Sequence, residues 1–278
     1  MQLPLESGKA KLPVFEEEKA SGLVIEKDEK GHIIKVEKDG VVYLNGTVKP
    51  CFDRPYSGLD CIPGWGWRDA FAPARELEEH VLRVTENGAK YAYVSKQAIF
   101  AAVDYEAQGN VLHVDVHYEV DDAFRALPRV GLEAIVAPGF EKLTYIGHGG
   151  NESYCDRLMS APFGKYESTV DGEHFAFCPP AENGGHEGAK YIELENADGR
   201  KIIIRPKQPV HFDVHHNSIE DYQNAKHDHE LPKREEIWLH IDAAHAPIGD
   251  DMAWSTGVDR KEMPAGGAYH LKFDIEIV

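Results

Sequence analysis

The chain has 278 residues, of which 42% are hydrophobic and 28% charged, and its formal net charge at pH 7 is −18. A chain of this length can bury a core of its own without disulfides or metals to stabilise it. Its negative surface repels phosphate backbones and anionic lipid, so neither nucleic acid nor a membrane is expected as a partner.

The cysteine pattern points to a reducing compartment. Cys51, Cys61, Cys155 and Cys178 are scattered, and no Cys-x-x-Cys pair is present. This argues against a thiolate zinc site and against a secreted disulfide scaffold. The N-terminal segment lacks the apolar core of a signal peptide, and no apolar run approaches the roughly 20 residues of a membrane helix. We therefore expect a cytoplasmic protein with no metal or other cofactor in this chain.

The N-terminal half is predicted to contain mainly strands after a lead-in over residues 1–20. Asp39-Gly40 separates two alternating runs, and Asp-Gly favours the primed turns whose twist suits a hairpin. A short helix is predicted over residues 73–81. Residues 111–120 alternate strictly, which predicts a strand with an apolar face made of Leu112, Val114, Val116, Tyr118 and Val120.

The C-terminal half continues the pattern with a second hairpin expected at Asp198-Gly199. A helix is predicted over residues 218–231, between an N-cap serine and the proline that follows. The runs 236–242 and 269–277 alternate again, and such alternation predicts strands with one buried face in antiparallel sheets packed face to face. The expected fold class is all-β, with one large antiparallel β-sandwich domain over residues 21–278.

The fifteen histidines raise the question of a metal site. His211 and His215 share one face if their segment is extended, and paired histidines on a strand can ligate zinc. Spacing fixes no third ligand, which a catalytic zinc site needs. We therefore interpret these histidines as solvated or hydrogen-bonded, and expect no metal.

Two glutamates in turn-rich motifs, Glu152 and Glu182, offer the carboxylate pair that hydrolysis of a glycosidic bond requires. Their separation in space does not follow from the sequence. Loop carboxylates usually have structural partners, so we interpret both as binding backbone amides or arginines. Asp156 and Arg157 are interpreted as an ion pair that organises the same loop.

Three tryptophans lie in predicted loops: Trp65 and Trp67 within PGWGWRDAF, and Trp254 within GDDMAWSTGV. Rings on rigid loops can bind the apolar faces of sugars, or they can cover the ends of a sandwich. Asp250 and Asp251 can accept backbone amides within their own turn, which would stiffen the loop that carries Trp254.

Five segments together resemble the motifs of one family. They read, in chain order, CFDRPYSGLD (51–60), GHGGNESYCDR (147–157), PAENG (180–184), AKHDHEL (225–231) and GDDMAW (249–254). In this order they resemble the C-terminal β-sandwich domain of β-galactosidases of glycoside hydrolase family two, including the separate small subunit of the heterodimeric enzymes. In the segment of residues 147–157, His148, Gly150 and Ser153 depart from the family's motif.

The resemblance implies a supersandwich of the kind shared with aldose epimerases of the galactose-mutarotase type. It implies that Trp254, with Asp251, reaches into the active site of a neighbouring (β/α)₈ barrel and binds a galactoside there, while Trp65 and Trp67 are further candidates. The catalytic glutamates belong to that barrel, so the expected partner is a β-galactosidase catalytic subunit or domain. Structural loop motifs are expected at Glu152, Asp156, Arg157, Glu182, Asn183 and His227.

Two alternative functions remain open. One is a free-standing aldose-epimerase-like enzyme, which would use a histidine and a glutamate drawn from His211, His215 and Glu182. The other is a carbohydrate-binding module without catalysis, which would use the loop tryptophans.

Overall fold

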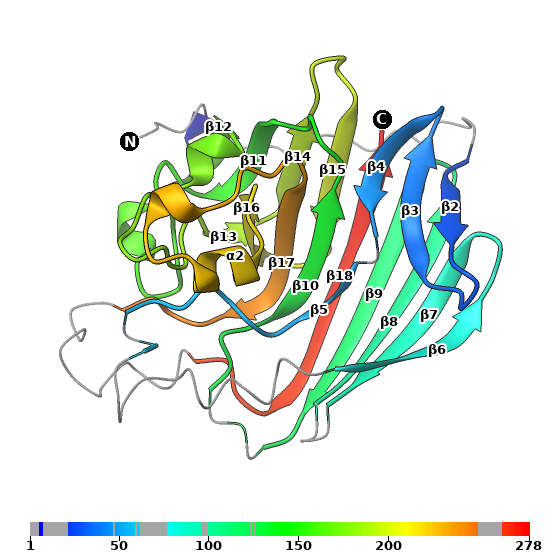
Figure 1. Cartoon of the computed structure of the whole chain (residues 1–278), viewed down its shortest axis with the longest axis horizontal. Helices are drawn as coiled ribbons and strands as arrows, with labels where there is room; N and C mark the ends of the chain where they lie inside the picture. The colour runs from blue at the N-terminus through cyan, green and yellow to red at the C-terminus, as the bar shows by residue number, and fades with distance from the viewer. Residues whose placement is uncertain are drawn as a thin grey trace.

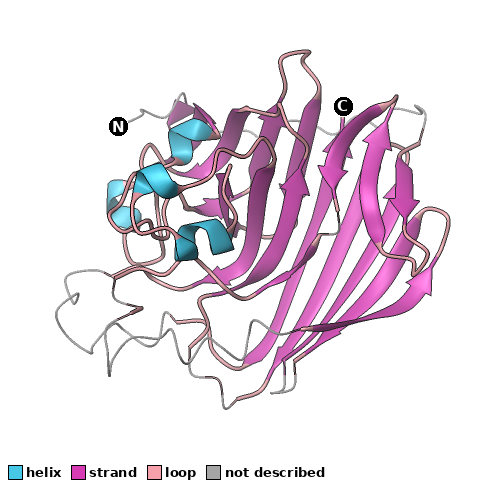
Figure 2. Cartoon of the chain, in the orientation of Figure 1, coloured by secondary structure: helices cyan, strands magenta, loops and turns pink. Residues whose placement is uncertain are grey.

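The computed structural model describes residues 6–7, 22–46, 48–58, 60–61, 77–95, 99–122, 124, 126–249 and 263–278. These residues form two large antiparallel sheets with a few short helical turns (Figures 1 and 2). The prediction of an all-β antiparallel sandwich is confirmed.

One sheet has ten strands. In spatial order they are β1 (Glu6–Ser7), β12 (Phe163–Thr169), β11 (Lys142–His148), β14 (Tyr191–Glu195), β15 (Lys201–Pro206), β18 (Gly267–Ile277), β9 (Val111–Val120), β8 (Ile99–Gln108), β7 (Gly88–Val94) and β6 (Glu78–Val84). The pair β9 and β18 forms its long central ladder, from Gly267 opposite Val120 to Glu276 opposite Val111. The predicted apolar faces of both strands are buried.

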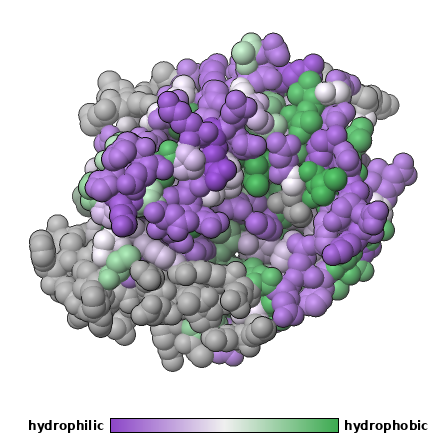
Figure 3. All heavy atoms as spheres, viewed as in Figure 1, coloured by the Kyte–Doolittle hydropathy of each residue, from purple (hydrophilic) through white to green (hydrophobic). Residues whose placement is uncertain are grey.

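The other sheet has eight strands. Their order is β13 (His186–Ala189), β16 (Val210–His215), β17 (Ile237–His245), β10 (Arg129–Val136), β4 (Val41–Asn45), β3 (Ile33–Lys38) and β2 (Val24–Lys27), and β5 (Lys49–Cys51) also pairs with β10. Apolar side chains from both sheets form one large buried cluster, including Leu239 and Ile241 of β17 and Leu271 and Phe273 of β18. The described residues on the face seen in Figure 3 are mostly hydrophilic, as the high net charge leads one to expect.

Both predicted hairpins form, but their turns differ. Asp39 and Gly40 have φ of 51° and 77° and join β3 to β4, as expected for an Asp-Gly turn. Between β14 and β15 the chain instead makes a wider loop over residues 196–200. The Asn196 side chain accepts two amides of this loop, at 3.0 and 2.9 Å, and so stabilises the wider turn in place of the predicted primed one.

The helix predicted over residues 218–231 is shorter than expected. Helix α2 covers Ile219–Asn224, with Ser218 and Asp221 forming a capping box, and ends where Ala225 becomes extended. Short 3₁₀ turns in the described part of the chain are η2 (Leu158–Ser160), η3 (Asp171–Glu173) and η4 (Asp228–Glu230). Among the described residues, no helix is long and apolar enough to cross a membrane.

The prediction of a helix over residues 73–81 is wrong for the residues that the structure describes. Residues 78–84 form the edge strand β6, whose pairing with β7 outweighs the local preference for helix. Residues 73–76 lie outside the described part of the chain.

Strands β16 and β17 differ from the prediction of one buried face. Ile237, Leu239 and Ile241 face the core as expected, but the alternate residues His240 and Asp242 are buried as well. Every residue of β16 is buried. Loops therefore cover the side of the eight-stranded sheet that faces away from the core, and the candidate site lies there.

Replacement of a core leucine tests this arrangement. Leu271→Ala should lower the free energy of unfolding by about 3 kcal/mol, since Leu271 is 0% exposed between the sheets. Leu82→Ala removes the same atoms from β6, where Leu82 is 56% exposed, and should change it by less than about 0.5 kcal/mol. Urea unfolding followed by circular dichroism measures both, and equal losses would contradict the position of β18.

Candidate functional site

The loop-covered face of the eight-stranded sheet carries a layer of polar side chains. This polar layer consists of Arg129, Glu133, His211, Asp213, His215, His240 and Asp242. Register pairs place His211 opposite Asp242, and His240 opposite both Asp213 and Glu133. Because paired residues of adjacent strands project to the same side, these groups interact with one another.

Arg129 is the centre of the polar layer and is 0% exposed. Its Nη2 donates to Asp213 at 2.9 Å and to Glu182 at 3.5 Å, and its Nε lies 3.8 Å from Asp242. Burial alone would lower the pKa of Arg129, but the three carboxylates raise it well above its usual value. The guanidinium is therefore held charged in the interior.

His240 and Asp213 form a buried ion pair. Nδ1 of His240 donates to Oδ1 of Asp213 at 2.7 Å. Burial opposes both charges, yet the charge of Asp213 raises the pKa of His240, and His240 together with Arg129 lowers the pKa of Asp213. His240 consequently carries two ring protons, one of which faces Glu133 at 3.4 Å from Nε2.

His245 and His215 are neutral, because burial lowers the pKa of each and outweighs the nearby carboxylates. Burial lowers the pKa of His215 to about 4, and Nε2 of His215 donates to the carbonyl of Asn183 at 2.9 Å. Burial and the charge of His211 lower the pKa of His245. The Nδ1 of His245 donates to the Ala246 carbonyl at 2.8 Å, which leaves its Nε2 as an acceptor 3.4 Å from Arg129.

Glu182 closes the layer from a loop. Its carboxylate accepts from Arg129 and, at 3.3 Å, from the hydroxyl of Tyr154. Burial raises its pKa to about 7, against the opposing charge of Arg129. His211 stacks on His245 with ring centroids 4.2 Å apart, and Nε2 of His245 lies 3.5 Å from Glu182. His215 binds the carbonyl of Asn183, the residue after Glu182, so His211, His215 and Glu182 belong to one cluster.

This cluster contains the residues required by the epimerase alternative, but a sugar cannot contact them in this arrangement. His211, His215 and Glu182 are at most 5% exposed. Glu182 binds Arg129, His211 binds Asp242, and His215 binds the carbonyl of Asn183. The arrangement favours a structural role.

Glu152 joins two of the motif segments. Its carboxylate accepts from Arg157 at 2.6 Å and from the amide of Gly184 at 3.0 Å. The expected ion pair between Asp156 and Arg157 is wrong, because the Arg157 guanidinium turns back over the Tyr154 ring to reach Glu152. Glu152 thus holds the segments 147–157 and 180–184 together.

Asp156 has a different partner. Its Oδ2 accepts the amide of Gly249 at 3.0 Å. The neighbouring Cys155 sulfur lies 3.8 Å from the carbonyl of His245. The two contacts tie the loop of residues 147–157 to the end of β17 and to the segment that follows it.

A second arginine holds the same segment. Arg54 is 1% exposed, and it binds Asp60 through Nε at 3.2 Å and Nη2 at 2.9 Å. Its Nη1 donates to the carbonyls of Ala246 and Pro247 at 3.0 and 3.2 Å. These contacts, named here the Arg54 clamp, connect the segment of residues 51–60 to the residues after β17.

Two predicted structural residues remain. Asn183 accepts the Phe175 amide at 2.9 Å and donates to the Ala181 carbonyl at 2.7 Å, so it shapes its own loop. His227 is exposed, lies 3.3 Å from Glu230 at the start of η4, and is not part of the polar layer. The predicted sugar-binding residues Trp65, Trp67, Asp251 and Trp254 lie outside the described residues.

Sequence reasoning did not identify the charged centre of the site. Arg54, Arg129, Asp213, His240 and Asp242 were not among the candidates. A signal was present, because the polar faces of HFDVH and HID consist of histidine and aspartate and contain no lysine or glutamate. Such short polar side chains opposite an apolar face are compatible with a covered sheet.

Comparisons with known sequences identify relatives. The family described as "Beta galactosidase small chain" matches residues 19–275. A β-galactosidase of Streptococcus thermophilus is 26% identical over 257 residues, which cover 88% of this chain and 25% of that protein. One of Photobacterium profundum is 29% identical over 207 residues, which cover 73% of this chain and 19% of that protein. The chain thus spans a quarter or less of the length of these relatives.

Comparisons with solved structures identify the fold. A galactose mutarotase-like protein from Lactobacillus casei superimposes with a TM-score of 0.55 at 11% identity, covering 93% of this chain and 98% of the other. A putative aldose 1-epimerase from Escherichia coli gives 0.51 at 12% identity, covering 90% and 93%. The sandwich is therefore of the galactose-mutarotase-like type predicted from the motifs.

The raised pKa of Glu182 predicts a pH-dependent effect of Glu182→Gln. A carboxyl group whose pKa is raised by folding stabilises the protein fully below its unfolded pKa, and this stabilisation is lost as the pH rises through the folded value of about 7. Glutamine does not titrate, so the stability of the variant relative to the parent should increase by about 2–3 kcal/mol from pH 5 to pH 8.

Denaturant unfolding at the two pH values measures this difference. Glu119→Gln, on the exposed side of β9, is the matched control and should show no such trend. A constant difference between Glu182→Gln and the parent would mean that Glu182 is not buried beside Arg129 as described.

Proposed function

The chain belongs to the β-galactosidase small-chain family, and we propose that it is the C-terminal domain or small subunit of a β-galactosidase. In this proposal it completes the galactoside site of a partner (β/α)₈ barrel, which supplies the catalytic acid and nucleophile. The described residues form a sandwich of antiparallel sheets, so such a barrel would have to be a separate domain or chain.

The observation that carries the proposal is the anchoring of residues 246–249. The Arg54 clamp and Asp156 hold this stretch through three backbone groups. Arg54 and Asp156 belong to two segments that resemble family motifs, and both bind backbone groups of the chain directly before residues 250–262. Such anchoring is what a loop that presents a binding residue requires.

The role proposed for Trp254 and Asp251 follows from this anchoring. A ring presented from a fixed base loses little conformational freedom when a ligand binds, so more of the stacking energy contributes to affinity. The Arg54 clamp also holds Asp60, which precedes the segment with Trp65 and Trp67. Both tryptophan-bearing segments thus start beside the same buried arginine, and we propose that they serve the same sugar site.

The proposed compartment is the cytoplasm. None of the four cysteines forms a disulfide, and two of them, Cys61 and Cys178, are exposed. Exposed unpaired thiols are characteristic of proteins kept in a reducing environment.

The complete enzyme tests the role of Trp254, whether the barrel is a separate large chain or part of the same polypeptide. The isolated chain should not hydrolyse a chromogenic β-galactoside, and the complete enzyme should. Trp254→Ala should raise KM several-fold, because a stacking contact worth about 1 kcal/mol or more is lost. Trp238→Ala, a tryptophan on β17, is the control and should leave KM unchanged.

Hydrolysis by the isolated chain would contradict the accessory role. An unchanged KM in Trp254→Ala would remove Trp254 from the galactoside site. Sugar binding by the isolated chain with no gain from a barrel partner would instead support the carbohydrate-binding module.

Asp156 tests the anchoring itself. In the complete enzyme, Asp156→Ala should raise KM by about fivefold or more, since the Gly249 amide loses a charged acceptor worth about 1.5–3 kcal/mol in favourable cases. Asp156→Asn retains an acceptor oxygen and should restore most of the affinity. If both variants have the KM of the parent, the hydrogen bond between the Gly249 amide and Asp156 has no part in forming the site.

A further inference from the structure

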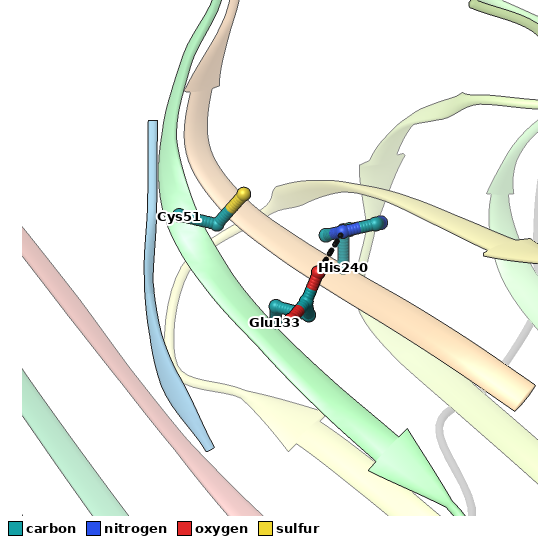
Figure 4. Close-up of side chains that lie close together, drawn as sticks. All are labelled: Cys51, Glu133 and His240. Atoms are coloured by element: carbon teal, nitrogen blue, oxygen red, sulfur yellow. Dashed lines mark hydrogen bonds and ion pairs between the residues drawn. The ribbon is translucent and has the colours of Figure 1, made fainter. Parts of the chain in front are cut away.

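Three side chains able to ligate a metal converge where β5, β10 and β17 lie side by side. Cys51 ends β5, Glu133 lies in β10, and His240 lies in β17 opposite Glu133. One ligand atom of each lies within 4.8 Å of the others. Figure 4 shows the Cys51 sulfur and the Glu133 carboxylate on the side of their strands that faces His240.

This spacing is close to that of a metal site. Zinc bonds of about 2.0–2.3 Å place the ligand atoms of one tetrahedral ion roughly 3.3–3.8 Å apart. The contact between His240 Nε2 and Glu133 Oε2, at 3.4 Å, already falls in this range. Small side-chain rotations would bring all three atoms around one ion without moving the paired strands.

His240 is oriented in the way that metal-binding histidines usually are. Its Nδ1 donates to Asp213, and Asp213 is itself held by Arg129 at 2.9 Å. A carboxylate on the second ring nitrogen fixes the ring and increases the basicity of the nitrogen that binds the metal. A metal ion would replace the direct contact between Nε2 and Glu133.

Two of the three ligands border a pocket, while His240 is 3% exposed. Cys51 and Glu133 line a pocket of about 440 Å³, together with Trp238, Glu220 and Gln223. Lys49 lies 3.5 Å from Oε1 of Glu133, so Oε2, which contacts His240, is the oxygen that would bind the ion. An ion could enter through this pocket and keep a water molecule as its fourth ligand.

Two other groups of ligating residues occur in the described part of the chain, and both are less suitable. His211, Asp242 and His245 are fully buried, and Arg129 lies 3.4 Å from His245 Nε2, where its charge opposes a cation. Asp115, His117 and His270 lie on the outer surface of the ten-stranded sheet, where Lys272 already occupies Asp115.

We propose that Cys51, Glu133 and His240 form a zinc site. Thiolate, imidazole and carboxylate are all ligands of tetrahedral zinc, and the sulfur favours zinc over magnesium or calcium. The ion would fasten β5 to β10 and β17 just before the chain reaches Arg54, and so would stabilise the base of the Arg54 clamp. This inference goes beyond the proposed role in a β-galactosidase and does not depend on it.

Cobalt is a spectroscopic probe of the site. The purified chain, treated with a chelator and then titrated with Co²⁺, should develop a near-ultraviolet thiolate-to-cobalt charge-transfer band that Zn²⁺ removes. Cys51→Ser should abolish the band. Cys155→Ser, which removes another thiol near the polar layer, should keep it, and so should His117→Ala, which removes one ligand of the surface group.

A second measurement needs no variant. Zn²⁺ should protect Cys51 from alkylation, as identified by mass spectrometry, while Cys61 and Cys178 remain reactive. Equal alkylation of Cys51 with and without zinc would overturn the proposal. So would a cobalt band that survives Cys51→Ser, a band lost equally in Cys155→Ser, or the absence of a band in the parent protein.

Discussion

The buried charge of Arg129 constrains the rest of this structure. A guanidinium removed from water is tolerated only when carboxylates and hydrogen-bond acceptors surround it. Asp242 comes from the neighbouring strand β17 and Asp213 from β16, one strand further away, but Glu182 comes from a loop. The loop must therefore fold over the sheet for the arginine to be satisfied. The eight-stranded sheet thus has an apolar face that forms the core and a charged face that fixes the loops above it.

A series of hydrogen bonds connects these loops to the chain that precedes the proposed sugar-binding segments. Tyr154 connects Glu182 to the motif segment of residues 147–157, and Glu152 ties that segment to the amide of Gly184. From there Asp156 reaches Gly249, while Arg54 reaches the carbonyls just before it. The residues shared with the family motifs thus act on backbone groups and on each other. Their contribution to a β-galactosidase would be to position a neighbouring segment, with no direct part in bond cleavage.

The elements predicted well are those whose local pattern and tertiary environment agree. The ladder of β9 and β18 follows from strict alternation, and the Asp39-Gly40 hairpin follows from turn chemistry. Alternation could not show that loops bury the polar side of β17, since polarity along a strand does not reveal what covers it. The Arg157 partner was missed because the nearest carboxylate in sequence is not the nearest in space. Cys51, Glu133 and His240 are far apart in sequence, and only strand pairing brings them together.

The position of β18 has a consequence for synthesis on the ribosome. Strand β18, residues 267–277, lies between β9 and β15. It therefore joins two halves of the ten-stranded sheet, one formed by residues 78–120 and the other containing residues 142–206. Until β18 emerges, both halves present an unpaired inner edge, which is the kind of surface that pairs with other chains. The contacts of β18 with β9 span more than a hundred residues, and such long-range contacts slow folding. The ten-stranded sheet therefore closes only after residues 267–277 have emerged, and nascent chains that stall before residue 267 would be the ones most prone to aggregate.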